Sequence, residues 1–117
     1  LRRRQGSLIT FGGPVTQQTR GNPRYAAYQM AKTALTVFTK SLAQAEAPRG
    51  VRANMINPGF IRTSAYSAKD ARELSPRIPA RRLGAPRDIA GAVVWLAGGD
   101  AGYVNGAVLD VGGGLWT

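Results

Sequence analysis

Three short apolar, β-prone segments alternate with two helical patterns along this chain, and no other feature constrains the fold as strongly. The predicted strands are residues 7–11, 51–57 and 107–111. Glycine or proline follows each of them at once, which ends a strand. Strands connected through helices pair in parallel with right-handed crossovers, so we predict an α/β fold.

The two helical patterns are marked by their ends and by the spacing of their apolar residues. Asn22-Pro23 combines a capping side chain with a proline suited to a first turn, and it predicts a helix that ends before Pro48. Pro86 begins the second helix and Gly98-Gly99 ends it. Apolar residues at steps of three and four are typical of a helix packed on a core. In the first helix these are Ala27, Met30, Ala34, Phe38, Leu42 and Ala45, and in the second Ile89, Ala92, Val93 and Leu96.

Residues 60–83 form a long irregular stretch, with one helical turn predicted around residues 68–74. Long loops inside compact domains are usually functional. In parallel sheets, ligands bind beyond the carboxyl ends of the strands. Here those ends carry Gly12-Gly13, Pro58-Gly59 and the glycines 112–114. We therefore expect the functional site at that edge of the sheet.

Composition limits the chemistry available there. The 117 residues include no cysteine and no histidine, which excludes disulfides, thiolate metal sites and the most common general base. Acid–base chemistry must come from tyrosine, lysine or the six carboxylates. The net charge of +10 can indicate a nucleic-acid partner. The arginines are mostly dispersed and no stacking aromatics are interleaved with them, so we do not favour that function.

The segment YAAYQMAK, residues 25–32, brings tyrosine and lysine together. Tyr28 and Lys32 are four residues apart and Tyr25 and Lys32 are seven apart, so on a helix either tyrosine shares a face with the lysine. An ammonium near a phenol stabilises the phenolate, which makes such a pair a plausible proton donor to a carbonyl. Taken alone, the spacing is also typical of two surface side chains.

Four segments, in order, resemble the short-chain dehydrogenase/reductase family over essentially the whole chain: YQMAK, GVRANMINPGFIRT, PARRLGAPRDIAGAVVWLAG and VNGAVLDVGGG. They correspond to the C-terminal half of the family's doubly wound Rossmann domain. The resemblance implies that residues 1–117 are a single partial domain of about three parallel strands and two long helices. The TGxxxGxG turn that cradles the pyrophosphate in this family is absent from the sequence. We expect an upstream part to be missing and the chain alone to bind dinucleotide poorly.

The resemblance also implies an oxidoreductase that uses NAD or NADP to reduce a small-molecule carbonyl or oxidise an alcohol. Tyr28 would be the acid–base residue, and Lys32 would assist it and hold the nicotinamide ribose. The other cofactor-binding residues would lie along the nicotinamide and near its carboxamide or the pyrophosphate: Pro58, Gly59, Ile61 and Thr63. In isolation, Thr63 and Ser64 are equally typical of an ordinary helix cap.

Substrate and partner contacts are implied by the same resemblance. Residues 64–83 would form a lid with Tyr66 lining the substrate, although a loop aromatic can also pack locally. A homo-oligomer would form through the helix at residues 23–47 and the C-terminal strand. No apolar run approaches the roughly 20 residues that span a bilayer, so no membrane partner is expected. The expected location is cytoplasmic.

One departure from the family pattern concerns the catalytic serine expected at the end of the first strand. That strand ends in Gly12-Gly13, and Val15 lies at the family's usual spacing before the tyrosine. None of these side chains can donate a hydrogen bond. Nearby polar residues that match no family motif are Thr10, Thr16 and Gln17.

Two further functions therefore stay open. Enoyl reductases of fatty-acid synthesis resemble the family, lack the serine and space tyrosine and lysine seven apart, as Tyr25 and Lys32 are. Pro58-Gly59 and Tyr28 fit the carbonyl-reductase pattern better. The other function is a catalytically incomplete fragment that serves as an oligomerisation module.

Overall fold

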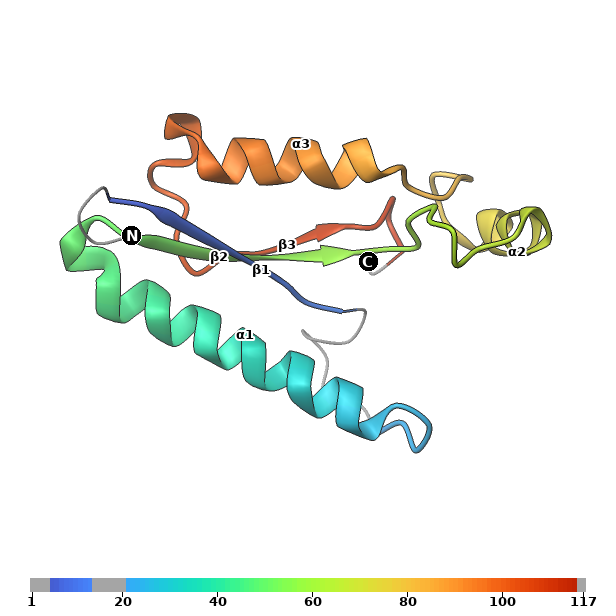
Figure 1. Ribbon diagram of the computed structural model, residues 1–117, viewed down its shortest axis with the longest axis horizontal. Helices are drawn as coiled ribbons and strands as arrows, with labels where there is room; N and C mark the ends of the chain where they lie inside the picture. The colour runs from blue at the N-terminus through green and yellow to red at the C-terminus, as the bar shows by residue number, and fades with distance from the viewer. Residues whose placement is uncertain (1–4, 14–20, 116–117) are drawn as a thin grey trace.

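The predicted strands pair in parallel, and the predicted helices cover both faces of the sheet. The computed structural model describes residues 5–13 and 21–115. The strands lie in the order β1 (Ser7–Phe11), β2 (Arg52–Pro58) and β3 (Val108–Val111). One face is covered by α1 (Ala26–Glu46) and the other by α3 (Pro86–Ala97), as Figure 1 shows. The Rossmann-like α/β arrangement predicted from the sequence is confirmed.

The predicted helical turn in the long connection is also present. It forms α2 (Ala68–Leu74), which projects beyond the carboxyl end of β2 (Figure 1). Short 3₁₀ turns lie at Ala47–Arg49, Ser75–Arg77 and Gly99–Ala101. Among the described residues, no helix is long and apolar enough to cross a membrane.

The apolar core lies between α3 and the sheet. Ile56, Leu96 and Ala101 are fully buried there. Partly buried residues from β1, β3, α3 and the loop before β3 surround them: Ile9, Ile89, Ala92, Val93, Val104, Leu109 and Val111. The four residues predicted on the buried side of the second helix all belong to this cluster. Removing aliphatic surface from water stabilises such contacts by about 1.5–3 kcal/mol per fully buried side chain, which fastens α3 to the sheet.

The first helix begins later than predicted. Its N-cap is Tyr25, and Asn22 is not its capping residue. The Asn22 side chain instead accepts a hydrogen bond from the Arg24 N–H at 3.0 Å, closing a tight turn of its own. The prediction failed because an asparagine followed by proline favours a local turn as readily as a helix cap.

The side of α1 that faces the sheet also differs from the predicted apolar stripe. Met30 and Phe38 of that stripe are 72% and 53% exposed. The buried residues of α1 are instead small or polar: Thr36, Thr39, Ala43 and Glu46. The Thr39 hydroxyl lies 2.8 Å from the Thr10 hydroxyl on β1, and it donates back to the helix at the Leu35 carbonyl. The two threonine side chains are short and hydrogen-bonded, so their polar groups have partners where α1 meets the sheet.

Candidate active site

A cavity of about 430 Å³ opens where the carboxyl ends of β1 and β2 meet the first turns of α1. We call it the tyrosine cavity. Its lining comes from three separate parts of the chain: Gly12, Gly13, Tyr25, Tyr28, Pro58, Gly59, Phe60 and Tyr66. Two of the three strand ends expected to form the site therefore line one cavity, together with the two tyrosines of the YAAYQMAK segment and the predicted lid residue Tyr66. The glycines that follow β3 line a different cavity.

Tyr28 and Lys32 lie next to each other beside this cavity. The Lys32 ammonium nitrogen is 5.7 Å from the centroid of the Tyr28 ring. The same nitrogen donates a 2.8 Å hydrogen bond to the backbone carbonyl of Phe11, the last residue of β1. One helical turn and one strand end therefore hold the ammonium beside the phenol. This arrangement places a cation beside the phenol while the Tyr28 ring stays partly exposed to a ligand.

Gly13 leaves room for the Tyr28 phenol. A Cβ atom on residue 13 would lie 2.6 Å from the Tyr28 hydroxyl oxygen and 3.1 Å from ring carbon Cε1. Real Cβ atoms do not approach other atoms so closely, so no larger residue fits while the phenol keeps this position. The strand end at which the sequence lacks the family's serine is thus a place where the tyrosine itself packs against bare backbone.

Thr10 is one of the polar residues considered in place of the serine, but its hydroxyl lies away from the tyrosine cavity. Its hydroxyl lies 2.8 Å from the Thr39 hydroxyl and 3.4 Å from the Asn54 carbonyl oxygen, at the contact between α1 and the sheet. Thr10 is also absent from the lining of the tyrosine cavity. Val15, Thr16 and Gln17 lie outside the described residues.

The predicted cofactor-binding residues after Pro58 do not all line the same cavity. Gly59 stays in the tyrosine cavity, whereas Ile61 lines a second cavity of about 350 Å³ at the carboxyl end of β3. Thr63 belongs to neither lining. Its hydroxyl accepts the Ala65 N–H at 3.3 Å and its carbonyl accepts the Tyr66 N–H at 3.2 Å, so it forms a local turn.

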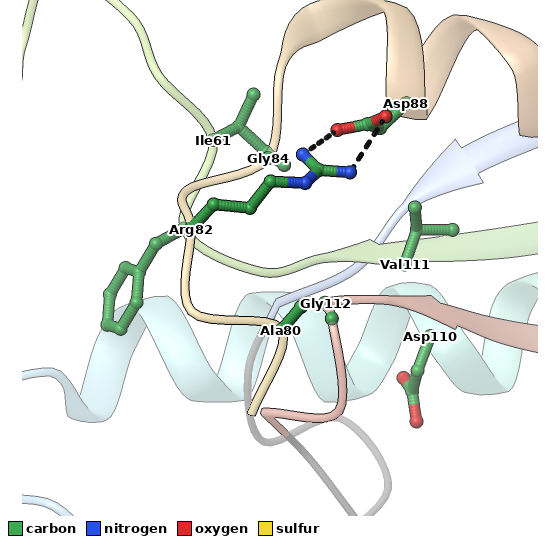
Figure 2. Close-up of a pocket in the computed structure, with 10 residues that line it drawn as sticks. Ile61, Ala80, Arg82, Gly84, Asp88, Asp110, Val111 and Gly112 are labelled. Carbon is green, nitrogen blue, oxygen red and sulfur yellow. Dashed lines mark hydrogen bonds and ion pairs between the residues drawn. The ribbon is translucent and has the colours of Figure 1, made fainter. Parts of the chain in front are cut away.

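The second cavity is bounded by an ion pair that the sequence did not reveal. Figure 2 shows the Arg82 guanidinium joined to the Asp88 carboxylate by two contacts, of 2.6 and 3.4 Å. Asp88 also accepts the Ala85 N–H at 2.8 Å. The hydrogen bond from Arg82, followed by that from Ala85, lowers the pKa of Asp88 from 3.8 to about 2. An acidic residue in the first turn of a helix opened by Pro86 was the available signal.

We predict that Asp88→Asn makes the fold less sensitive to acid. Asp88 holds its proton more weakly in the folded chain, so its interactions stabilise the fold above about pH 4 and are lost as the pH falls through about 2. Thermal midpoints measured near pH 6 and near pH 2 should therefore differ more for the natural chain than for Asp88→Asn. Arg82→Gln should reproduce the effect. Equal acid sensitivity in the natural and Asp88→Asn chains would contradict this role.

Comparison with known protein families shows which family the chain belongs to. A family model described as enoyl-(acyl carrier protein) reductase matches residues 1–116. The chain belongs to the short-chain dehydrogenase/reductase family. Membership confirms the resemblance inferred from the sequence motifs.

Among curated members of the family, 3-oxoacyl-(acyl-carrier-protein) reductases of Vibrio cholerae and Escherichia coli are 41% and 40% identical to this chain over 119 aligned positions. These alignments cover 99% of the chain and 48% of each relative. The chain thus spans about half the length of the curated relatives it matches.

Solved structures agree with this assignment. A gluconate 5-dehydrogenase from Burkholderia cenocepacia in complex with NADP and tartrate superposes with a TM-score of 0.83 at 30% identity. A short-chain dehydrogenase/reductase variant from Serratia marcescens gives 0.82 at 31% identity. Both superpositions cover 97% of this chain and 46% of the other.

The tyrosine cavity fits one end of the family's dinucleotide cofactor. A nicotinamide ring is flat with a polar carboxamide edge, and it would fit against Pro58 and Gly59 next to Tyr28. Lys32 is partly exposed there, at the end of β1. No TGxxxGxG turn is present anywhere in the sequence to hold the pyrophosphate. The residues present therefore fit the nicotinamide end and not the phosphates.

Proposed function

We propose that residues 1–117 form the proton-handling part of a short-chain oxidoreductase domain that reduces a small-molecule carbonyl with NADH or NADPH, or runs the reverse oxidation. The observation that carries this proposal is the Lys32 ammonium held beside the Tyr28 phenol at the end of β1. When bound, the cofactor supplies the hydride to the carbonyl carbon. Tyr28 donates its hydroxyl proton to the carbonyl oxygen as the new C–H bond forms, and Lys32 stabilises the phenolate that remains.

The end of β1 and the turn after β2 have a supporting role in this proposal. Pro58 and Gly59 would position the nicotinamide, and Gly13 leaves room for the Tyr28 phenol beside it. Lys32 would also bond the nicotinamide ribose. Ile61 and Thr63 stay predicted cofactor contacts that would need the cofactor to reach past the tyrosine cavity.

A second candidate function is reduction of an enoyl thioester with Tyr25 as the proton donor. It is favoured by one observation: Tyr25 lines the same cavity as Tyr28 and is 55% exposed. Against it, the contact of the Lys32 ammonium is with the Tyr28 ring.

Turnover of matched substrates separates the two functions. We define the joined protein as the amino-terminal half of the Vibrio cholerae relative followed by residues 1–117. Given NADPH, it should reduce a ketone and leave a trans-2-enoyl thioester unchanged. Reduction of the enoyl thioester alone would favour the Tyr25 function, and reduction of neither would contradict both.

We also propose that α1 binds a second copy of this chain. Met30, Val37 and Phe38 share one face of α1 and are 72%, 62% and 53% exposed. Exposed apolar side chains gathered on one face mark interaction surfaces. The C-terminal strand β3 is an edge strand of the sheet, and it would supply the second contact of an oligomer.

Phe38→Arg should therefore shift the chain toward the monomer in light-scattering measurements, because a buried unpaired guanidinium opposes association. Tyr103→Arg changes a fully exposed aromatic elsewhere and should leave the mass unchanged. A monomeric natural chain, or an oligomer indifferent to Phe38→Arg, would contradict this surface.

A further inference from the structure

We propose that the substrate of the tyrosine cavity is a neutral aromatic ketone. The proposal rests on the function proposed above, because it names the substrate class of the same site. It follows from the lining of the cavity and from its charge.

Aromatic rings form half of the described lining. They come from α1 at Tyr25 and Tyr28, and from the segment after β2 at Phe60 and Tyr66. The Phe60 and Tyr66 rings pack edge to face, with centroids 6.3 Å apart and planes at 80°. Such pairs are favoured by the ring quadrupoles and offer rigid apolar walls. A planar ligand ring can stack or pack edge-on against these walls at little cost in side-chain entropy.

The remaining walls carry no bulky polar group. They are the backbone of Gly12, Gly13 and Gly59 and the ring of Pro58. A volume of about 430 Å³ is within the usual range of small-molecule sites and exceeds that of one aromatic ring. With its carbonyl oxygen at the Tyr28 hydroxyl, a ketone would share the cavity with the rings of Phe60 and Tyr66.

The tyrosine cavity and the second cavity differ in the charge of the residues that line them. None of the eight described residues that line the tyrosine cavity is Asp, Glu, Lys or Arg. The second cavity, by contrast, is lined by Arg82, Asp88 and Asp110. A carboxylate or sugar acid placed among the rings would lose much of its hydration and find no charged residue in the described lining, because Lys32 lies outside it and donates to the Phe11 carbonyl. A neutral substrate avoids that cost.

A cationic ligand is the main competitor, because aromatic cages bind quaternary ammonium groups. Two observations oppose it here. The Lys32 ammonium already lies 5.7 Å from the Tyr28 ring centroid. The chain as a whole carries a net charge of +10, which repels a further cation.

Three ketones of nearly equal shape test the proposal directly. Binding of 4-isopropylacetophenone, 4-acetylbenzoate and (4-acetylphenyl)trimethylammonium to the 117-residue chain can be followed by ligand-observed NMR, with added salt to screen the net charge. We expect the neutral ketone to bind at least about 10-fold more tightly than either ion. Tighter binding of the carboxylate or of the ammonium, or no binding of the neutral ketone, would overturn the proposal.

Two tyrosines give a matched pair of variants. Tyr66→Ala removes a wall of the cavity and should weaken binding of the neutral ketone by about 10-fold. Tyr66→Phe keeps the ring and should retain the affinity. Tyr103→Ala, at a fully exposed position outside the cavity, should have no effect. Equal affinities for Tyr66→Ala and Tyr103→Ala would overturn the placement of the ligand.

The binding readout needs no cofactor and no turnover, so it separates this proposal from the proposed function. A joined protein that binds the neutral ketone selectively but never reduces it would overturn the proposed function alone. A joined protein that reduces 4-acetylbenzoate as well as it reduces 4-isopropylacetophenone would overturn the substrate class alone.

Discussion

Tyr28→Phe should lower ketone reduction by the joined protein by at least about 100-fold, the usual contribution of a positioned general acid. The substitution removes one oxygen and keeps the ring against Gly13. The Lys32 hydrogen bond to the Phe11 carbonyl does not involve that oxygen and should persist. The loss should therefore appear in kcat, while the affinity for the neutral ketone changes little. Steady-state NADPH oxidation at saturating ketone measures it.

Tyr25→Phe is the matched control, because Tyr25 lines the same cavity and is similarly exposed. No contact ties it to Lys32 among the described interactions, so its hydroxyl should be dispensable and kcat should stay within about threefold. If Tyr25→Phe abolished turnover while Tyr28→Phe did not, the proton donor would be Tyr25 and the enoyl-reductase function would be favoured.

Gly12→Ala should reduce the free energy of unfolding by about 3 kcal/mol, at the upper end of the usual cost of overpacking. The new Cβ would overlap the Asn57 side-chain oxygen and approach the Met55 sulfur to 2.7 Å. Neither Asn57 nor Gly12 can move aside easily. Asn57 is 2% exposed and donates to Asp110 at 2.9 Å, and the Gly12 N–H is fixed by a 2.8 Å bond to the Ile56 carbonyl.

Urea unfolding of the chain measures this loss, and Gly91→Ala provides the control. Gly91 lies inside α3, and a Cβ there would meet nothing within 4 Å. Alanine should stabilise that helix by about 0.5–1 kcal/mol, because it loses less backbone entropy than glycine. Equal effects of the two substitutions on the free energy of unfolding would show that the surroundings of Gly12 can accommodate a Cβ atom, which would contradict this prediction.

The parts of the fold that sequence predicted well are those marked by local signals. Pro86 and Gly98-Gly99 bound α3, and its buried side followed from apolar spacing alone. The sheet-facing side of α1 could not be predicted in the same way. Thr36 and Thr39 are buried there because they hydrogen-bond within the helix and contact β1 and β2, and that depends on which strands lie beneath.

The site shows the same division between local and long-range information. Helical spacing predicted that Lys32 would share a face with a tyrosine, and the structure places it beside Tyr28. That the ammonium is held by the Phe11 carbonyl, and that the phenol packs on Gly13, required the distance between β1 and α1. Neither contact has a local signature in the sequence.

The most direct test of Tyr28 as proton donor in a hydride-transfer enzyme uses NADPH that carries deuterium at the transferring position. The joined protein is incubated with this cofactor and 4-isopropylacetophenone, and the product is analysed by mass spectrometry. We predict an alcohol with one deuterium on the carbinol carbon from the natural segment and from Tyr25→Phe, and almost none from Tyr28→Phe. Labelled alcohol formed equally well by Tyr28→Phe, or no labelled alcohol from the natural segment, would contradict the proposed function.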